Sequence, residues 1–332
     1  MSTARHGGWQ RRARCRAVSA CLAAALCLWA CAGAHQGAAE GGAPGQTGGA
    51  DAVSGATRPG QSVVGSVTSD YALLDEPLPR DAELEADAVF TLVRWSNNLS
   101  YGLANVAPPG TQLVVLVPTV RAEATTDARV LEAAVRLCAE VWQEPDILVV
   151  IPAGRGIPAS YTALLGEPAT SLGVRLVALQ GEPLRPLPCM TSLTRPSCDV
   201  PEPVALADAV VVVPALWRDA AGTVHGALDA VVALSPEPLA SDSAAVDWVS
   251  AVAPLYVFAD ALRPRVGGEV QALNAILASS DPCAVDMVGA QFLGGRPSDV
   301  PALRLASRHE LGRAAWKDVA VNGVPVPKLG KR

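Results

Sequence analysis

Six short apolar runs, several of them almost pure Val, Leu and Ile, recur along the chain beyond residue 66. Runs of this kind are typical of strands that are covered on both faces of a sheet, because such strands have no solvent-facing side that would call for polar residues. This feature restricts the fold more than any other in the sequence. The runs occupy residues 88–95, 112–117, 146–151, 174–179, 209–213 and 255–259.

The stretch between the second and third runs, TTDARVLEAAVRLCAEVW, has the period of an amphipathic helix, and Thr126 or Asp127 can cap its start. Strand, helix and strand in this order form a βαβ unit, which implies parallel strands. We therefore expect an α/β fold, with a mainly parallel sheet that is built from βαβ units and covered by helices on both faces.

Residues 255–324 extend this pattern toward the C-terminus. A buried strand ends in Asp260, and we expect a helix after the glycine turn at residues 267–268. Asp281 before Pro282 predicts the start of a second helix, because Asp caps helices well and Pro suits the first helical position. A third helix is expected to follow.

The distribution of charge argues against a nucleic-acid-binding protein. The net charge is −6, and the first 30 residues hold five arginines and no acidic residue. The remaining residues therefore carry 21 basic and 32 acidic side chains, a net charge of −11. A nucleic-acid-binding protein should present a basic surface instead, so we expect no nucleic-acid partner.

The N-terminus has the layout of a secretory signal, with arginines up to Arg16 followed by a mostly apolar run over residues 17–34. A retained membrane anchor is the alternative, since a spanning helix needs about 20 apolar residues. The residues before and including Cys31, LWAC, resemble a bacterial lipobox with Cys31 as the lipidated residue. A cut after Ala34 would instead release a soluble protein.

We accordingly divide the chain into four parts: a signal peptide of possible lipoprotein type over residues 1–34, a Gly/Ala-rich linker over 35–65, a single α/β domain over 66–326 and a tail over 327–332. The linker nearly lacks large apolar side chains, so it cannot bury enough surface to fold. We expect an exported protein of the cell envelope, either an outer-membrane lipoprotein held to the membrane by its lipidated N-terminus or a periplasmic protein.

Two cysteines, Cys189 and Cys198, lie in the Pro-rich stretch 181–203, which predicts a long irregular loop of the kind that is often functional or mobile. In an oxidising compartment a disulfide between them would stabilise that loop, and two free thiols are the alternative. No CxxC motif occurs in the sequence, so we expect no iron–sulfur cluster and no zinc bound by cysteine.

Several segments, in the same order, resemble the family called domain of unknown function 362. VVLVPTV resembles the family's VVLKPNL strand, and DAVVVVPALW resembles its strand that ends in PKLK. LASSDPCAVDMVGAQFLG resembles the ASxDPVAVDAVA…LG segment, which is the most specific of these matches. The resemblance covers about residues 112–324 and implies the α/β domain proposed above.

The chain departs from this family at polar positions. Val117 and Thr119 stand where the family has Lys and Asn, Trp217 and Asp219 stand where it has Lys and His, and the later Lys-Asn pair aligns near Leu228-Asp229. The ferredoxin-type cysteine cluster of many relatives is also absent. These departures imply that the strand ends are apolar to acidic, which favours a cation or a neutral ligand over phosphate.

Three residues are candidates for catalysis. Asp260 ends a buried strand, where ligands of open α/β sheets bind, although it could equally cap the following turn. Asp286 could pair with Asp260 in metal binding or acid–base chemistry, or lie on a solvated helix face. His225 could act as a general base, but a lone histidine is more often a partly buried polar group.

Four further residues are candidates for ligand binding. Arg155 follows a strand and could contact an anion, although a short loop explains it equally well. Gly267 and Gly268 could let a ligand approach the backbone, but a plain turn is the better interpretation. For Asp281 the capping role is stronger than a role in chemistry.

Three functions remain open from the sequence alone. The first is a ligand-binding or catalytically reduced module of this family outside the cytoplasm. The second is an enzyme with an Asp260 and Asp286 carboxylate site, with or without a divalent cation as cofactor. The third is a structural envelope protein without a pocket. The sequence names no substrate.

The N-terminal interpretation predicts that a fatty-acid analogue labels the protein through Cys31 and that Cys31→Ala abolishes the label, because the lipid is carried by that thiol. Metabolic labelling of both variants checks this. Label that persists on Cys31→Ala, or a mature N-terminus at His35, would contradict it.

Overall fold

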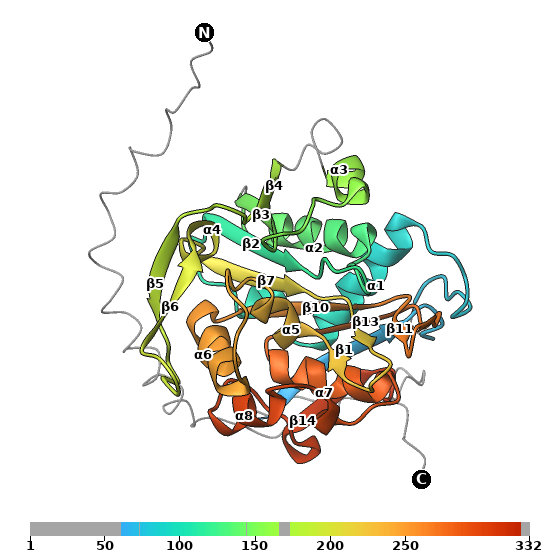
Figure 1. Cartoon of the computed structure of the whole chain (residues 1–332). Coiled ribbons are helices and arrows are strands. Elements are labelled where there is room, and N and C mark those ends of the chain that lie inside the picture. Colours follow the sequence, from blue (N-terminus) through green and yellow to red (C-terminus); the bar gives the residue numbers. More distant parts are fainter. Residues whose placement is uncertain (1–60, 73, 144, 166–172, 327–332) are drawn as a thin grey trace, which may run out of the picture. The chain divides into compact units, whose positions relative to one another are not determined.

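The computed structural model describes residues 61–326, apart from 73, 144 and 166–172. An eight-stranded sheet forms the centre of this part of the chain (Figure 1). All its strands run in the same direction except β13, which is antiparallel to both of its neighbours. The spatial order is β14 (Val319–Gly323), β1 (Ser62–Thr68), β13 (Ala275–Ser279), β10 (Tyr256–Ala261), β7 (Ala209–Val213), β2 (Leu113–Pro118), β3 (Asp146–Ile151) and β4 (Val174–Ala178).

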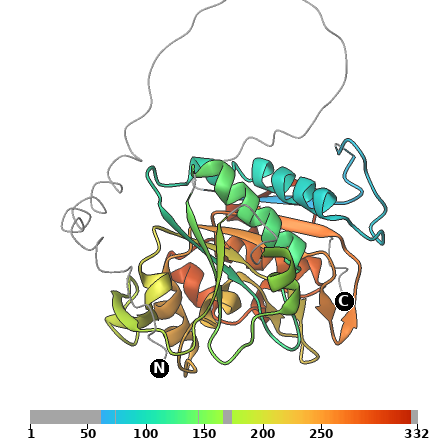
Figure 2. The same cartoon turned by 90° about the horizontal axis from the view of Figure 1, so that it is seen from above.

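Helices cover both faces of this sheet, so the expected α/β fold with a mainly parallel sheet is confirmed. One face carries α1 and α2, which lie side by side in Figure 2, together with α3. The other face carries α4 to α8. The helices are α1 (Ala86–Leu99), α2 (Ala128–Val141), α3 (Ala159–Leu165), α4 (Glu202–Ala205), α5 (Ala227–Val232), α6 (Asp242–Val252), α7 (Pro282–Phe292) and α8 (Leu303–Arg308).

Alternating side chains of each strand supply the two cores. In β2, Val115 and Val117 pack with α5 to α8, whereas Val114 and Leu116 pack with α1 to α3. Because successive side chains of a strand point to opposite faces, a strand buried on both sides needs an unbroken apolar run. This requirement explains why β2, β3 and β7 are almost pure Val, Leu and Ile.

Shorter elements surround the sheet. A four-stranded sheet has the order β12 (Glu269–Val270), β11 (Arg265–Val266), β8 (Trp217–Arg218) and β9 (Val224–His225). A hairpin joins β5 (Leu184–Pro188) to β6 (Ser197–Pro201), and single turns of 3-10 helix lie at η4 (Leu103–Asn105), η5 (Pro297–Asp299) and η6 (Trp316–Asp318). Among the residues described, no helix is long and apolar enough to cross a membrane.

Most of the expected strands and two of the expected caps are confirmed. The runs at 146–151 and 209–213 are β3 and β7 with the same bounds, and those that form β2, β4 and β10 agree within two residues. The side chain of Asp127 caps α2 by accepting from the Arg129 amide at 2.9 Å. The side chain of Asp281 caps α7 by accepting from the Ala284 amide at 2.9 Å.

The run at 88–95 is not a strand, because it lies inside helix α1. The buried residues of this helix include Val89, Leu92, Val93 and Ser96, which recur at spacings of three and four, the helical period. The expected helix after residues 267–268 is also wrong. β12 and then β13 occupy this stretch, since β13 finds strand partners on both sides, in β1 and β10. Tertiary pairing of this kind overrides local preference.

The stretch 181–203 is the β5–β6 hairpin rather than an irregular loop. The hairpin loop is anchored by Asp247 of α6, which is fully buried and accepts hydrogen bonds from residues 191–195. Burial by itself raises the pKa of this carboxyl, but the hydrogen bonds from Thr191, Leu193 and Thr194 outweigh it and lower the pKa to about 2. A carboxylate with several donors therefore ties the hairpin to the domain.

The hairpin brings Cys189 and Cys198 together, with 3.0 Å between the sulfur atoms, and both side chains are buried. The disulfide itself stays a prediction. We expect non-reducing peptide mapping of protein prepared under oxidising conditions to find the two joined. The closed loop would stabilise the fold by roughly 2–3 kcal/mol in the chain-entropy model. Free alkylation of both thiols would contradict the prediction, and the buried Cys138 serves as the control for accessibility.

Candidate functional site

The sheet reverses its direction of growth between β2 and β7. From β2 the chain adds β3 and β4 on one side, and it then adds β7 and β10 on the other side. The connections that leave the carboxyl ends of β2 and β7 therefore diverge. In open α/β sheets, ligands bind in the crevice outside the carboxyl ends of the strands at such a switch point. The carboxyl ends of β2 and β7 are therefore the candidate position for a ligand site.

The two connections at the switch point are fixed by two threonines. Thr126 donates through its hydroxyl to the Val213 carbonyl at 2.6 Å and accepts from the Thr119 amide at 3.0 Å. The hydroxyl of Thr119 accepts from the Ala215 amide at 3.2 Å. Both threonines are buried, so these bonds are shielded from water and hold the loop after β2 against the loop after β7.

A pocket of about 170 Å³ opens at this crevice. Its walls come from the loop between β2 and α2, from the residues that follow β7, and from the end of β10 with the segment that follows it. Four ionisable side chains line it, two acidic and two basic. The lining residues are Glu123, Ala124, Thr125, Ala215, Leu216, Asp260, Arg263, Pro264, Arg265 and Val270.

Asp260 connects the end of β10 to the start of α2. Its carboxylate accepts from the Asp127 amide at 2.7 Å and from the Leu262 amide at 2.9 Å, and the residue is 6 % exposed. Burial raises the pKa of this carboxyl to about 6, and the nearby charge of Asp127 acts in the same direction. The two amide donors and Arg129 oppose the rise. Asp260 therefore changes protonation near neutral pH at the wall of the pocket.

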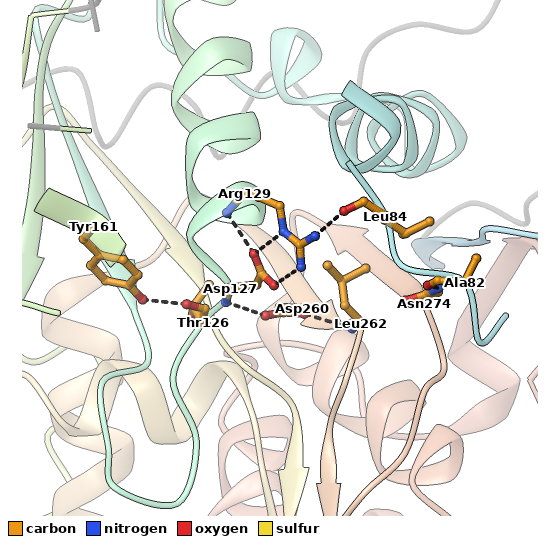
Figure 3. A network of polar contacts seen from close by, with 9 residues as sticks. All are labelled: Ala82, Leu84, Thr126, Asp127, Arg129, Tyr161, Asp260, Leu262 and Asn274. Carbon is orange, nitrogen blue, oxygen red and sulfur yellow. Dashed lines mark hydrogen bonds and ion pairs between the residues drawn. The ribbon is translucent and has the colours of Figure 1, made fainter. Parts of the chain in front are cut away.

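A polar network surrounds this carboxylate (Figure 3). Arg129 forms an ion pair with Asp127 at 2.5 Å and also donates to the Leu84 carbonyl, so it links α2 to the segment before α1. On the other side, the Tyr161 hydroxyl donates to the Thr126 carbonyl at 2.9 Å. These contacts hold the first turn of α2 in place, and with it the loop that forms one wall of the pocket.

Asp286 lies on the opposite face of the sheet from Asp260. Its carboxylate accepts from the Ala227 amide at 2.5 Å and from the Leu228 amide at 2.9 Å, at the start of α5. Burial raises its pKa to about 7, against the effect of these two amides, and the charges of Asp229 and Asp281 contribute to the rise. The alternative of a solvated helix face is wrong, because this residue is 1 % exposed.

His225 lies apart from Asp260 and close to Asp286, two residues before the Ala227 amide that Asp286 binds. Its ring stacks on Trp217 with 3.9 Å between ring centres. Its nitrogens lie 3.6 Å from a carboxylate oxygen of Asp219 and 3.5 Å from one of Asp229. Arg121 forms an ion pair with Asp229 at 3.0 Å. The two distances from the imidazole nitrogens are too long for strong hydrogen bonds, so the stacking on Trp217 is the close contact that holds the ring.

The structure thus does not gather the three candidate catalytic residues into one site. Asp260 binds the start of α2, Asp286 binds the start of α5 on the other face, and His225 contacts two different aspartates. Within the described ranges, no group of three or more His, Cys, Asp and Glu could hold a metal ion.

Local structure explains the four candidate ligand-binding residues: two form a turn, one caps a helix and one is exposed in a loop. Gly267 and Gly268 form the β11–β12 turn with φ of 60° and 95°, in the left-handed region that favours glycine. Asp281 accepts from the amides of Ala284 and Arg313. Arg155 is exposed in the loop after β3 and does not line the switch-point pocket. Cys31 lies outside the described residues.

Arg263 and Arg265 line the candidate site but were not predicted from the sequence. Both line the pocket, and Arg263 is close enough to Asp127 to help lower the pKa of that carboxyl. The available signal was their position directly after a strand that ends in Asp260. They add positive charge to an edge that the departures at Val117 and Asp219 led us to expect to be apolar to acidic.

The fold is that of an α/β domain with a small pocket at the switch point of its sheet. The chain belongs to the family described as domain of unknown function (DUF362), whose model matches residues 116–291, just over half of the chain. A search of curated proteins gives no match.

Among solved structures, the chain is similar to the lactate racemase apoprotein from Thermoanaerobacterium thermosaccharolyticum. The TM-score is 0.41 at 12 % sequence identity, over 58 % of this chain and 52 % of that one. The similarity therefore spans about half the length of that protein, and it carries no argument about function.

The raised pKa values of Asp260 and Asp286 predict a pH dependence of stability. Each carboxyl keeps its proton in the folded state at pH values where the unfolded chain has lost it. The free energy of unfolding therefore falls as pH rises from about 4 to about 6 for Asp260 and to about 7 for Asp286.

Asp260→Asn should remove the first component of this slope and Asp286→Asn the second, each on the order of 2–4 kcal/mol across its window. Urea unfolding of the three proteins at pH 4 to 8 measures the effect. The two variants serve as controls for each other, because their windows end at different pH values. Parallel curves for all three proteins would contradict the assignment.

Proposed function

We propose that this chain is a small-ligand-binding member of the DUF362 family and that its ligand occupies the switch-point pocket. The observation that carries the proposal is the position of the pocket, at the carboxyl ends of β2, β7 and β10 where the sheet reverses its direction of growth. Ligand sites of open α/β sheets occur at this position for a geometric reason, because diverging connections leave a crevice between them.

The arrangement supports binding rather than catalysis. Both oxygens of Asp260 accept backbone hydrogen bonds, so the carboxylate already has a role in holding α2 to β10. Asp286, the carboxylate that was expected to act with Asp260, lies on the other face of the sheet and binds the start of α5. The buried threonines fix the crevice before any ligand arrives, and a preformed site lowers the cost of binding.

One observation favours an enzyme as the second candidate. The pKa of Asp260, about 6, lies near the value that suits a general acid or base at neutral pH, and this residue lines the pocket. Turnover that is lost in Asp260→Asn, with ligand binding retained, would favour this candidate over a binding module.

We further propose that the protein acts outside the cytoplasm, as a lipoprotein anchored through Cys31 or as a released periplasmic protein. The support is the layout of residues 1–34, an arginine-containing head followed by an apolar run that ends near a lipobox-like LWAC. A single lipid-bearing terminus followed by a long polar segment would leave the α/β domain free to meet small solutes.

A thermal-shift screen tests the binding proposal, with small acids, amines, amino acids, divalent cations, phosphate and nucleotides as separate classes. A ligand that binds only the folded state, at 100 times its Kd, stabilises the protein by about 2.7 kcal/mol. At least one class should raise the melting temperature by several degrees. Ala124→Trp should abolish that shift, because this half-buried residue lies on the pocket wall and the indole would fill the space.

Ala221→Trp is the matched control, since Ala221 is exposed on the β8–β9 turn and does not line the pocket. It should leave the ligand-induced shift unchanged. The proposal is wrong if no class stabilises the wild type, or if Ala124→Trp and the wild type respond alike.

A further inference from the structure

The charges of the switch-point pocket come from two segments that are distant in sequence. Glu123 lies on the loop between β2 and α2, whereas Arg263 and Arg265 follow β10. Pro264 and Val270 lie beside the arginines, and Leu216 comes from the connection after β7. The pocket therefore offers a carboxylate, two guanidinium groups and an apolar surface within about 170 Å³.

The remaining carboxylates near the pocket already have partners. Asp260 accepts from two backbone amides, and Asp127 is paired with Arg129. By contrast, neither Glu123 nor the two arginines form a salt bridge with any residue that the structure describes. Three charged groups, one negative and two positive, are thus available to a ligand.

The chemistry of these groups points to a ligand with both charges. Guanidinium groups bind carboxylates through paired, charge-assisted hydrogen bonds, which makes arginine the preferred partner for a carboxylate ligand. A free carboxylate such as that of Glu123 attracts an ammonium group. A purely anionic ligand would leave Glu123 facing a like charge, and a purely cationic ligand would face two arginines.

The size of the pocket restricts the ligand further. Its volume of about 170 Å³ lies below the roughly 300–1,000 Å³ of pockets that hold drug-sized ligands, so the pocket favours a smaller molecule. On the basis of the proposed function, we propose that the pocket binds a small zwitterion of amino-acid type, with its carboxylate on Arg263 and Arg265 and its ammonium group on Glu123.

Four probes with the same three-carbon stem separate the contributions of charge: alanine as the zwitterion, propionate as the anion, propylamine as the cation and propionamide as the neutral compound. Isothermal titration of the wild-type protein at pH 7 should show alanine binding at least ten-fold more tightly than each of the others. The reason is that only alanine satisfies both kinds of charge in the pocket.

Three variants assign the contacts. Arg263→Gln and Arg265→Gln should each weaken alanine and propionate binding by about ten-fold or more, because each removes a carboxylate partner. Glu123→Gln should weaken alanine binding by a similar factor without weakening propionate binding. Arg155→Gln is the matched control, since this arginine is exposed in the loop after β3 and should not change affinity for any probe.

The outcomes separate this inference from the proposed function. If propionate binds as tightly as alanine, or if Glu123→Gln leaves alanine affinity unchanged, the zwitterion proposal is overturned. The same holds if none of the four probes binds while another class in the thermal-shift screen stabilises the wild type but not Ala124→Trp, and the proposed function then survives. If no compound binds in either experiment, both proposals fail.

Discussion

The carboxylate of Asp260 is the contact on which the candidate site depends. By accepting from the amides of Asp127 and Leu262, it joins the end of a central strand to the first turn of α2 and to the chain that leaves the strand. The wall with Glu123 and the wall with Arg263 are both continuous with those anchored points. A buried carboxylate with two donors is thus the structural base of the pocket.

The same device recurs elsewhere in the domain. Asp286 accepts from the first amides of α5, and Asp281 accepts from the first turn of α7. Unpaired amide groups at a helix start are favourable partners for a negative charge. Burial nevertheless raises the pKa of all three carboxyls, so a raised pKa in this fold marks an aspartate that supports a helix as readily as one that reacts. Position in the sheet therefore distinguishes the candidate ligand site, whereas a raised carboxyl pKa does not.

Much of the fold could be predicted because its cause is local. β3 and β7 need unbroken apolar runs, and the caps of α2 and α7 depend on single aspartates next to the helix start. The prediction of a strand at residues 88–95 was wrong because a short apolar run is compatible with both a strand and a buried helix face. The prediction of a helix after residues 267–268 was wrong because β13 forms through pairing with β1 and β10, and β1 lies far away in the sequence. The relation of Asp260 to Asp286 could not be predicted either, since the face that a connecting helix covers follows from the order of the strands in the sheet, which the sequence pattern does not give.

The placement of β13 has a consequence for the order in which the domain can be made. Its antiparallel course joins β1, near residue 65, to residues around 278, and β1 also pairs with β14 near residue 321. The first described strand to leave the ribosome therefore waits for more than 200 further residues before it gains a partner strand, although helix α1, which packs on it, follows directly in the sequence. At usual rates of synthesis this delay is roughly 10–40 s. During this interval the backbone groups of β1 that later bond to β13 and β14 have no strand partner.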